Sequence, residues 1–265
     1  MARRYPNVRL AVCWIWTSQF VWTKSVASLL RLRHPDGVDV QFFQGRGWSP
    51  AARHLHACER AIAWGADCLV ILGADQVYGE DLLERLVARR REGYEVVAAL
   101  VPTRGYLGWQ DMKPFQPMAW RLKSQGLTPI QWRADCYAPI DPKDGAMQRI
   151  DFIGSGCILF DADHLLALQR PWFFETIDPV TQQRTACMDT KFCFRLRREA
   201  HAQVWVDTTI KITHVHDMPI DETFQDRFDD WMVAGQGDPT ICDYGTPARM
   251  VKASTVEPRS ALVDA

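Results

Sequence analysis

The sequence predicts an α/β fold, in which one Rossmann-like domain has a mostly parallel central sheet flanked by helices. Two observations lead to this prediction. Short apolar segments alternate with amphipathic segments of helical periodicity through residues 8–101, which is typical of strand–helix–strand units with parallel strands. The chain has 265 residues, of which 47% are hydrophobic and 24% charged. This length and composition suit a single domain with its own core.

Four strands and three helices are predicted in the first part of the chain. Ser49 followed by Pro50 is typical of a helix start, and Gly65 of a helix end. Residues 89–91 are all Arg and close the third helix, where positive charge suits the helix dipole, so we do not interpret them as a binding patch. The strands are expected at residues 8–14, 38–43, 68–72 and 96–101, and the helices at 25–32, 50–64 and 80–91.

The pattern changes after residue 101. Residues 102–150 are rich in Pro, Gly, Trp and polar residues, and a long irregular segment of this kind is typical of a binding loop, here expected as an irregular hairpin or loop insertion. The domain is predicted to span residues 1–234, and residues 235–265 to form a loosely ordered tail because they lack periodicity. The other predicted elements are strand-like pieces at 117–122 and 129–136, strands at 150–160, 204–206 and 210–216, and helices at 163–168 and 189–200.

The charge balance argues against a basic nucleic-acid-binding surface. The chain has 31 Lys and Arg against 32 Asp and Glu, a net charge of −1, whereas nucleic-acid binding usually needs a basic excess. No apolar run reaches the ~18 residues of a membrane span, and the N-terminus lacks a signal-peptide pattern. The eight cysteines are scattered without a C-x-x-C motif. We therefore expect reduced thiols, a cytoplasmic location and no membrane span.

Asp75 is a first candidate site residue. It follows the apolar segment 68–72, and ligands of open parallel sheets bind at the carboxyl ends of the strands. Its carboxylate is a suitable ligand for a Mg²⁺ or Mn²⁺ ion that carries a diphosphate. The alternative is that Asp75 only caps the turn before the helix at 80–91, and both interpretations remain open.

Two further candidates lie near the end of the predicted domain. In the string His214-Val215-His216-Asp217, alternate residues of a strand face the same side, so both imidazoles could reach one metal ion. The alternative is an ordinary pair of surface histidines. Asp189 begins a predicted helix, where Asp is a preferred N-cap, but a carboxylate presented to a cleft is also a possible general base. The chain has no P-loop, dinucleotide-binding fingerprint or nucleophile elbow.

These residues follow the order of the motifs in the GT-A-fold, nucleotide-sugar-dependent glycosyltransferases, and the chain resembles that family, in particular its family-2-like group, over residues 8–216. Residues 70–78 resemble the strand that ends in the D-x-D motif, with Gly73 at the first acid and Asp75 at the second. Residues 52–54 resemble the family's element that faces the nucleotide, and residues 150–160 resemble its strand at the acceptor site. Residues 188–196 resemble the segment that carries the catalytic base, and residues 211–214 resemble the strand that ends in a metal-binding histidine.

The resemblance implies a single GT-A domain of the hexosyltransferase type. It would transfer a sugar from a nucleotide-diphosphate donor to an acceptor hydroxyl on a glycan, lipid, protein or other compound, with inversion, and it would use Mn²⁺ or Mg²⁺. The implied metal ligands are Asp75 and His214, and His216 is either a further ligand or a residue that contacts a ligand. The implied catalytic base is Asp189. The implied donor-binding residues are Arg53, Asp75, Gly154, Ser155 and Gly156.

Two departures from the family pattern leave other classes open. Gly73 replaces the first acid of D-x-D, and Met188 replaces the acid that usually precedes the base. The alternatives are a non-catalytic GT-A-like binding protein, a metal-dependent hydrolase that uses the histidine pair and Asp217, and a nucleotidyltransferase.

Tryptophan is abundant, with 11 residues in the chain. Four of them flank the expected acceptor cleft, where aromatic rings could stack on sugars, although a core or loop-anchoring role is also open. These four are Trp109, Trp120, Trp132 and Trp172.

Overall fold

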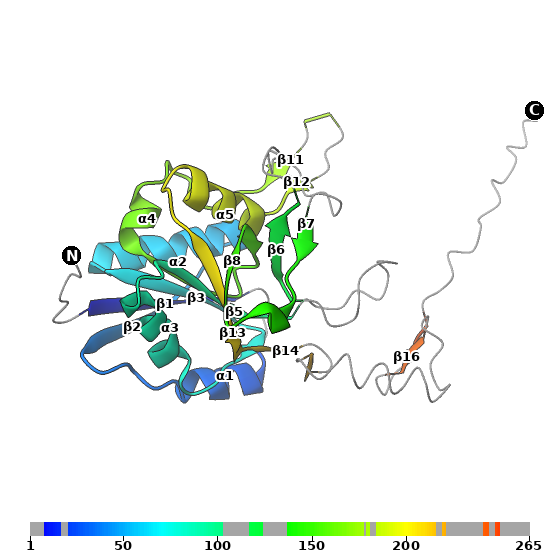
Figure 1. Cartoon of the computed structure of the whole chain (residues 1–265), viewed down its shortest axis with the longest axis horizontal. Coiled ribbons are helices and arrows are strands. Elements are labelled where there is room, and N and C mark those ends of the chain that lie inside the picture. Colours follow the sequence, from blue (N-terminus) through cyan, green and yellow to red (C-terminus); the bar gives the residue numbers. More distant parts are fainter. Residues whose placement is uncertain are drawn as a thin grey trace, which may run out of the picture.

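The computed structural model describes residues 8–16, 21–102, 117–123, 137–177, 179–180, 184–215, 219–220, 241–243 and 247–249. Its centre is a seven-stranded sheet with the order β2-β1-β3-β10-β5-β13-β8 (Figure 1). The strands are β1 (Val8–Ile15), β2 (Val38–Gln44), β3 (Cys68–Gly73), β5 (Val96–Leu100), β8 (Met147–Ile150), β10 (Cys157–Asp161) and β13 (Val204–Lys211).

Most strands of this sheet run in the same direction, as predicted. β1 pairs in parallel with β2 and β3, and β5 pairs in parallel with β13. β10 lies between β3 and β5 and is antiparallel to both, and β8 is antiparallel to β13 at one edge. Because β10 runs the opposite way, its amino end meets the carboxyl ends of β3 and β5. That edge of the sheet is where a ligand site is expected.

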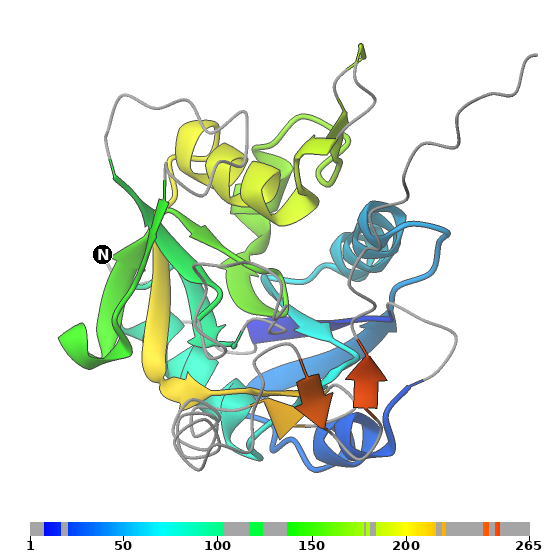
Figure 2. The same cartoon turned by 90° about the vertical axis from the view of Figure 1, so that its right-hand side faces the viewer.

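Helices cover both faces of the sheet. α2 (Pro50–Trp64), α4 (Ala162–Leu166) and α5 (Met188–Arg198) lie on one face, and α1 (Thr23–Leu30) and α3 (Leu82–Arg91) on the other (Figure 1). Figure 2 shows the same separation, with α5 above the sheet and α1 below it. Alternate residues of β1 enter different cores: Ala11 and Cys13 pack on the α2 side, and Leu10 and Val12 on the α3 side. Double coverage explains why the strands read as continuous apolar runs.

The described residues also form smaller sheets. β4 (Gln76–Val77), β14 (Thr213–Val215) and β15 (Pro219–Ile220) form one in the order β15-β14-β4. β6 (Ala119–Leu122), β7 (Tyr137–Pro139) and β9 (Phe152–Ile153) form another in the order β7-β6-β9, so the described part of the segment 102–150 contains the antiparallel pair β6–β7. The two-stranded pairs are β11 (Thr176–Ile177) with β12 (Arg184–Ala186), and β16 (Ile241–Asp243) with β17 (Pro247–Arg249).

Some predicted boundaries are wrong. The continuous strand expected at 150–160 is divided among β8, β9 and β10, because the turn at residues 154–156 takes the chain from the β6–β9 sheet into the central sheet. α1 begins at Thr23, two residues before the predicted start. The strand-like piece predicted at 129–136 lies outside the described residues. The proposed boundary at residue 234 and the loosely ordered tail stay predictions.

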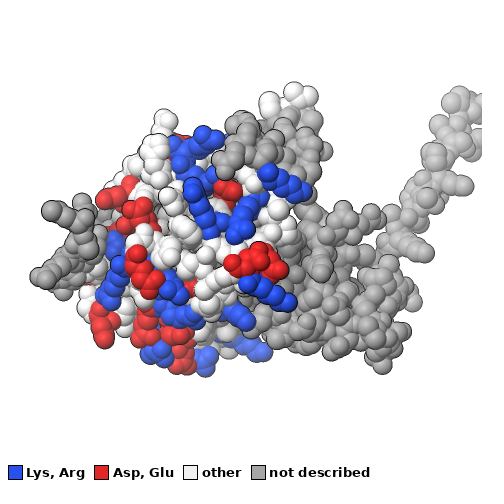
Figure 3. Space-filling view, viewed as in Figure 1, with Lys and Arg blue, Asp and Glu red and all other residues white. Residues whose placement is uncertain are grey.

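Over the described residues, no helix is long and apolar enough to cross a membrane. The six cysteines described there, Cys13, Cys58, Cys68, Cys157, Cys187 and Cys193, are free thiols. On the face seen in Figure 3, acidic and basic side chains are interspersed. The cytoplasmic location stays a prediction.

Candidate functional site

A cavity of about 360 Å³ lies at the carboxyl edge of the parallel strands. The ends of β1 and β3 contribute Ile15 and Gly73 to its wall, and the turn before β10 contributes residues 154–156. Six polar side chains converge on it from α2, the β3–β4 turn, β4, the 154–156 turn, α5 and β14: His54, Asp75, Gln76, Ser155, Asp189 and His214. Residues separated by up to 160 positions along the chain, from His54 to His214, therefore face one space.

Most of the predicted site residues lie around this cavity. The exceptions are Arg53 and His216. Arg53 is absent from the described lining, and its Nε donates a hydrogen bond to the carbonyl oxygen of Gly47 at 2.9 Å, so it holds the loop before α2. His216 lies outside the described residues. The residues brought together are Asp75, Gly154, Ser155, Gly156, Asp189 and His214; their roles stay predictions.

Asp75 and His214 form a buried pair. The Oδ2 atom of Asp75 lies 3.3 Å from Nε2 of His214, and both residues are under 10% exposed. The Nδ1 atom of His214 lies 3.0 Å from the carbonyl oxygen of Pro102. Since a carbonyl only accepts, Nδ1 carries a hydrogen and donates it. If the ring is neutral, Nε2 presents a lone pair toward the carboxylate. A proton or a metal cation between Nε2 and Oδ2 would then join the two side chains.

The backbone holds Asp75 in this place. Its carbonyl accepts a hydrogen bond from the Val215 N–H at 2.7 Å, and Ala74 N–H donates to the Ile15 carbonyl at 3.0 Å. The alternative interpretation, that Asp75 caps the turn before the next helix, stays open, although Asp75 is not the N-cap of that helix. α3 begins at Leu82, and the N-cap position belongs to Asp81.

Gln76 was not predicted as a site residue. It is 3% exposed, and its carboxamide oxygen is buried with no hydrogen-bond partner among the described residues. A Cβ atom at Gly156 would lie 2.0 Å from its Nε2 atom, so in this conformation the carboxamide occupies the space that a side chain at position 156 would enter. Two features of the sequence could have indicated Gln76 as a site residue: it directly follows Asp75, and Gly73 stands where the D-x-D motif has its first acid.

His54 was also missed, although the segment 52–54 was recognised. Its Nδ1 lies 2.7 Å from the Pro50 carbonyl oxygen and must donate to it. Its Nε2 lies 3.1 Å from Oγ of Ser155. Burial lowers the pKa of His54 below its ordinary value, although the hydrogen bond to Pro50 and the charge of Asp189 act in the other direction. The neutral ring therefore accepts the Ser155 hydroxyl hydrogen, which leaves the Ser155 oxygen lone pairs for a ligand.

Asp189 lies in the first turn of α5. The N-cap of this helix is Cys187, so the alternative that Asp189 is the N-cap is wrong. At the second helical position, its charge lies beside the free N–H groups of the helix start, which stabilise negative charge. Asp189 and the Asp75–His214 pair are thus held by different elements around the same cavity.

The donor atoms fit a divalent cation only in part. In the described chain, no group of three His, Cys, Asp or Glu side chains gathers as a metal site. The facing Asp75 carboxylate and His214 Nε2 are nevertheless ligand types that Mn²⁺ accepts. A metal ion at this pair stays a prediction.

Two of the four tryptophans expected at an acceptor cleft are core residues instead. Trp120 is 5% exposed and stacks on Phe152 with a centroid distance of 4.8 Å, and Trp172 is 2% exposed. Neither belongs to the described lining of the cavity. For these two, the stacking interpretation is wrong; Trp109 and Trp132 lie outside the described residues.

No protein-family model matches this chain, and no curated protein sequence matches it. Among solved structures, the crystal structure of A197 from STIV is similar with a TM-score of 0.50 and 16% identity, over 79% of this chain and 86% of that chain. Apo-UDP-glucose pyrophosphorylase gives a TM-score of 0.35 and 7% identity, over 76% of this chain and 66% of that chain. The first likeness concerns the fold alone, and the second is too distant to support a conclusion.

Proposed function

We propose that this protein is a metal-dependent glycosyltransferase that moves a sugar from a nucleotide-diphosphate donor to an acceptor hydroxyl with inversion. One observation carries the proposal: a carboxylate–imidazole pair and a separate carboxylate face the same cavity at the carboxyl edge of a mostly parallel sheet. The pair suits the charged donor, and the separate carboxylate suits proton removal from the acceptor.

Asp75 and His214 would hold the cation. A bound divalent ion supplies Lewis-acid stabilisation to the diphosphate leaving group. The hydrogen bond from His214 Nδ1 to the Pro102 carbonyl keeps Nε2 directed at Asp75, and such a second hydrogen bond fixes the tautomer and orientation of a metal-binding histidine.

Asp189 would act as the general base. Its carboxylate accepts the proton of the acceptor hydroxyl while that oxygen attacks the anomeric carbon. The bond from the anomeric carbon to the diphosphate oxygen breaks, and the nucleoside diphosphate leaves with the electron pair. A single displacement of this kind inverts the configuration at the anomeric carbon.

Ser155 and His54 would position the substrate. Since the Ser155 hydroxyl donates to the neutral His54 ring, its oxygen is oriented to accept a hydrogen bond from a sugar hydroxyl. The glycines on either side of Ser155 allow the backbone to approach a ligand closely.

A thermal-shift screen of nucleoside diphosphates and nucleotide sugars, with and without Mn²⁺, tests this function. We expect a nucleotide to raise Tm only with Mn²⁺, and Asp75→Ala to abolish this shift while Asp39→Ala, an exposed carboxylate on β2, leaves it unchanged. Product analysis then separates the classes, because a transferase releases a nucleoside diphosphate and a nucleotidyltransferase releases pyrophosphate. If no nucleotide stabilises the protein with Mn²⁺, the proposal is wrong.

A further inference from the structure

The carboxamide oxygen of Gln76 is buried without the hydrogen bond that a buried amide oxygen normally accepts. It lacks a partner among the described residues. Gln148, the other deeply buried glutamine of the described residues, is bonded at both ends of its amide: its Oε1 accepts from Arg121 at 2.7 Å, and its Nε2 donates to the Asp141 carbonyl at 2.6 Å. Burying an unpaired amide destabilises a fold, so the position of Gln76 points to a ligand.

Two glycines make room for this carboxamide. A Cβ atom at Gly156 would lie 2.0 Å from Nε2 of Gln76, and a Cβ atom at Gly73 would lie 3.2 Å from it and 3.0 Å from Oδ1 of Asp75. Gly73 is the position at which the D-x-D pattern has its first acid. The Gln76 carboxamide and the Asp75 carboxylate thus crowd the space that an acid at position 73 would enter.

Gln76 also faces His214. The two residues are direct partners in the antiparallel pair β4–β14, so their side chains share one side of this small sheet with Cβ atoms about 4.5–5.5 Å apart. Asp75 precedes Gln76 and lies 3.3 Å from His214. Gln76, Asp75 and His214 line the same cavity.

We propose that Gln76 supplies a third protein ligand, its amide oxygen, to the divalent cation held by Asp75 and His214. This inference rests on the proposed function, which assigns the cation to that pair. Amide oxygens are ordinary ligands of hard divalent cations, and the number of charged ligands tunes their affinity. With one carboxylate instead of two, the site is expected to bind Mn²⁺ weakly alone and tightly when a nucleoside diphosphate adds its own oxygens.

Isothermal titration calorimetry of the full chain with Mn²⁺ alone, and with Mn²⁺ plus ADP, GDP, CDP or UDP, tests the inference. Gln76→Glu keeps the shape and adds a charge, so we expect Mn²⁺ alone to bind roughly tenfold more tightly or better. Gln76→Met fills similar space without a hard donor and should weaken binding several-fold. Gln41→Glu adds the same charge at an exposed position on β2 and should leave the affinity unchanged.

The outcomes separate this inference from the function on which it rests. If Asp75→Ala abolishes Mn²⁺ binding but both Gln76 variants bind like the wild type, Gln76 is not a ligand and the inference alone is wrong. If Asp75→Ala also has no effect, the cation site itself is wrong. Should Gln76→Glu unfold without metal, recovery of its Tm by Mn²⁺, with no such recovery for Gln76→Met, supports the inference; equal recovery of both contradicts it.

Discussion

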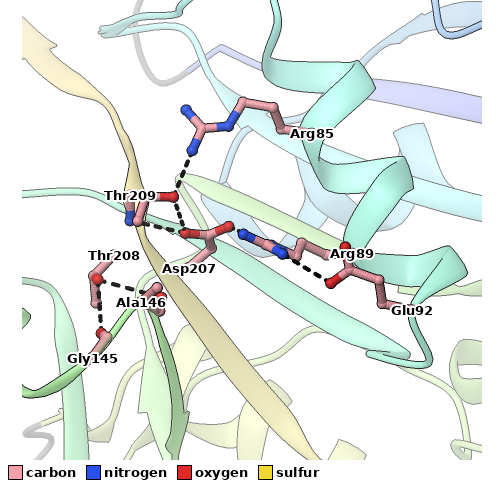
Figure 4. A network of polar contacts seen from close by, with 8 residues as sticks. All are labelled: Arg85, Arg89, Glu92, Gly145, Ala146, Asp207, Thr208 and Thr209. Atoms are coloured by element: carbon pink, nitrogen blue, oxygen red, sulfur yellow. Dashed lines mark hydrogen bonds and ion pairs between the residues drawn. The ribbon is translucent and has the colours of Figure 1, made fainter.

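Two buried aspartates, Asp207 in β13 and Asp75 in the turn between β3 and β4, have different surroundings. Asp207 in β13 is 0% exposed, and its carboxylate accepts hydrogen bonds from Thr209 N–H at 2.8 Å, Thr209 Oγ1 at 2.5 Å and Arg89 Nε at 2.7 Å (Figure 4). Burial alone would raise the pKa of Asp207, but these hydrogen bonds together outweigh it and hold the pKa below its ordinary value.

Asp75 is also buried, but its carboxylate lines a cavity and lies 3.3 Å from Nε2 of His214. The nearby carboxamide oxygen of Gln76 has no hydrogen-bond partner among the described residues. The Asp207 carboxylate is held by three donors of the fold, whereas the Asp75 carboxylate lines a cavity that a ligand can enter. The following predictions test this difference.

The largest effect is expected for Asp75→Ala. Loss of this charge should reduce sugar transfer by roughly 10³-fold or more, because a bound cation supplies several kcal/mol of transition-state stabilisation. The free energy of unfolding should fall by less than for Asp207→Ala, because Asp75 lines a cavity that water can fill. Steady-state kinetics and urea unfolding measure the two quantities. A loss of stability as large as that of an Asp207 variant would place Asp75 with the structural aspartates.

Asp189→Asn should reduce kcat by about 10²–10⁴-fold, the usual contribution of a general base, while Mn²⁺-dependent nucleotide binding is retained. The control is Asp163→Asn, which changes an exposed carboxylate in the first turn of α4. Equal effects of the two variants on kcat would contradict the assignment of the base.

Asp207→Ala should lower the free energy of unfolding by about 3 kcal/mol, because it removes a buried carboxylate that accepts three hydrogen bonds from the partly buried donors of Thr209 and Arg89. Since the pKa of Asp207 is lowered by folding, its contribution is present above the ordinary value of 3.8 and is lost as the pH falls through the folded value. Urea unfolding at pH 7 and near pH 3 should show the difference between wild type and variant shrinking at acid pH. An unchanged difference would contradict this account.

The smallest effect is expected at His54, whose pKa is lowered by burial. The unfolded chain then binds more protons, so the stability contributed by neutral His54 is complete above the ordinary value of 6.5 and decreases as the pH falls below it. His54→Gln should remove this part of the pH dependence between pH 7 and 5. Parallel unfolding curves for wild type and variant over this range would show that His54 does not titrate in this way.

Local patterns predicted the elements well where the signal lies within a few residues. The helix expected after Ser49 begins at Pro50, with the Ser49 hydroxyl accepting from Ala52 N–H at 3.1 Å, and Gly65 ends it in the left-handed region with φ of 84°. The apolar segment at 68–72 is β3, buried on both faces. These features depend on capping chemistry and hydrophobicity, which the neighbouring residues carry by themselves.

The composition of the site could be predicted only in part. Asp75, Asp189 and His214 were found because strand ends and helix starts are recognisable. His54 and Gln76 were not, because their importance depends on residues far along the chain: His54 contacts Ser155, 101 positions away, and Gln76 faces His214 and Gly156. Likewise, nothing near Trp120 indicated that it would stack on Phe152.

By itself, the sequence determined the α/β class, most helix and strand positions and three acidic or histidine candidates, since these follow from local periodicity, caps and the polar residues that end apolar strands. Only the tertiary structure decided that β10 lies antiparallel between β3 and β5. This arrangement brings the glycine turn beside Asp75 and Gln76, and side-chain pairing across strands is set by sheet register rather than by neighbours in the chain.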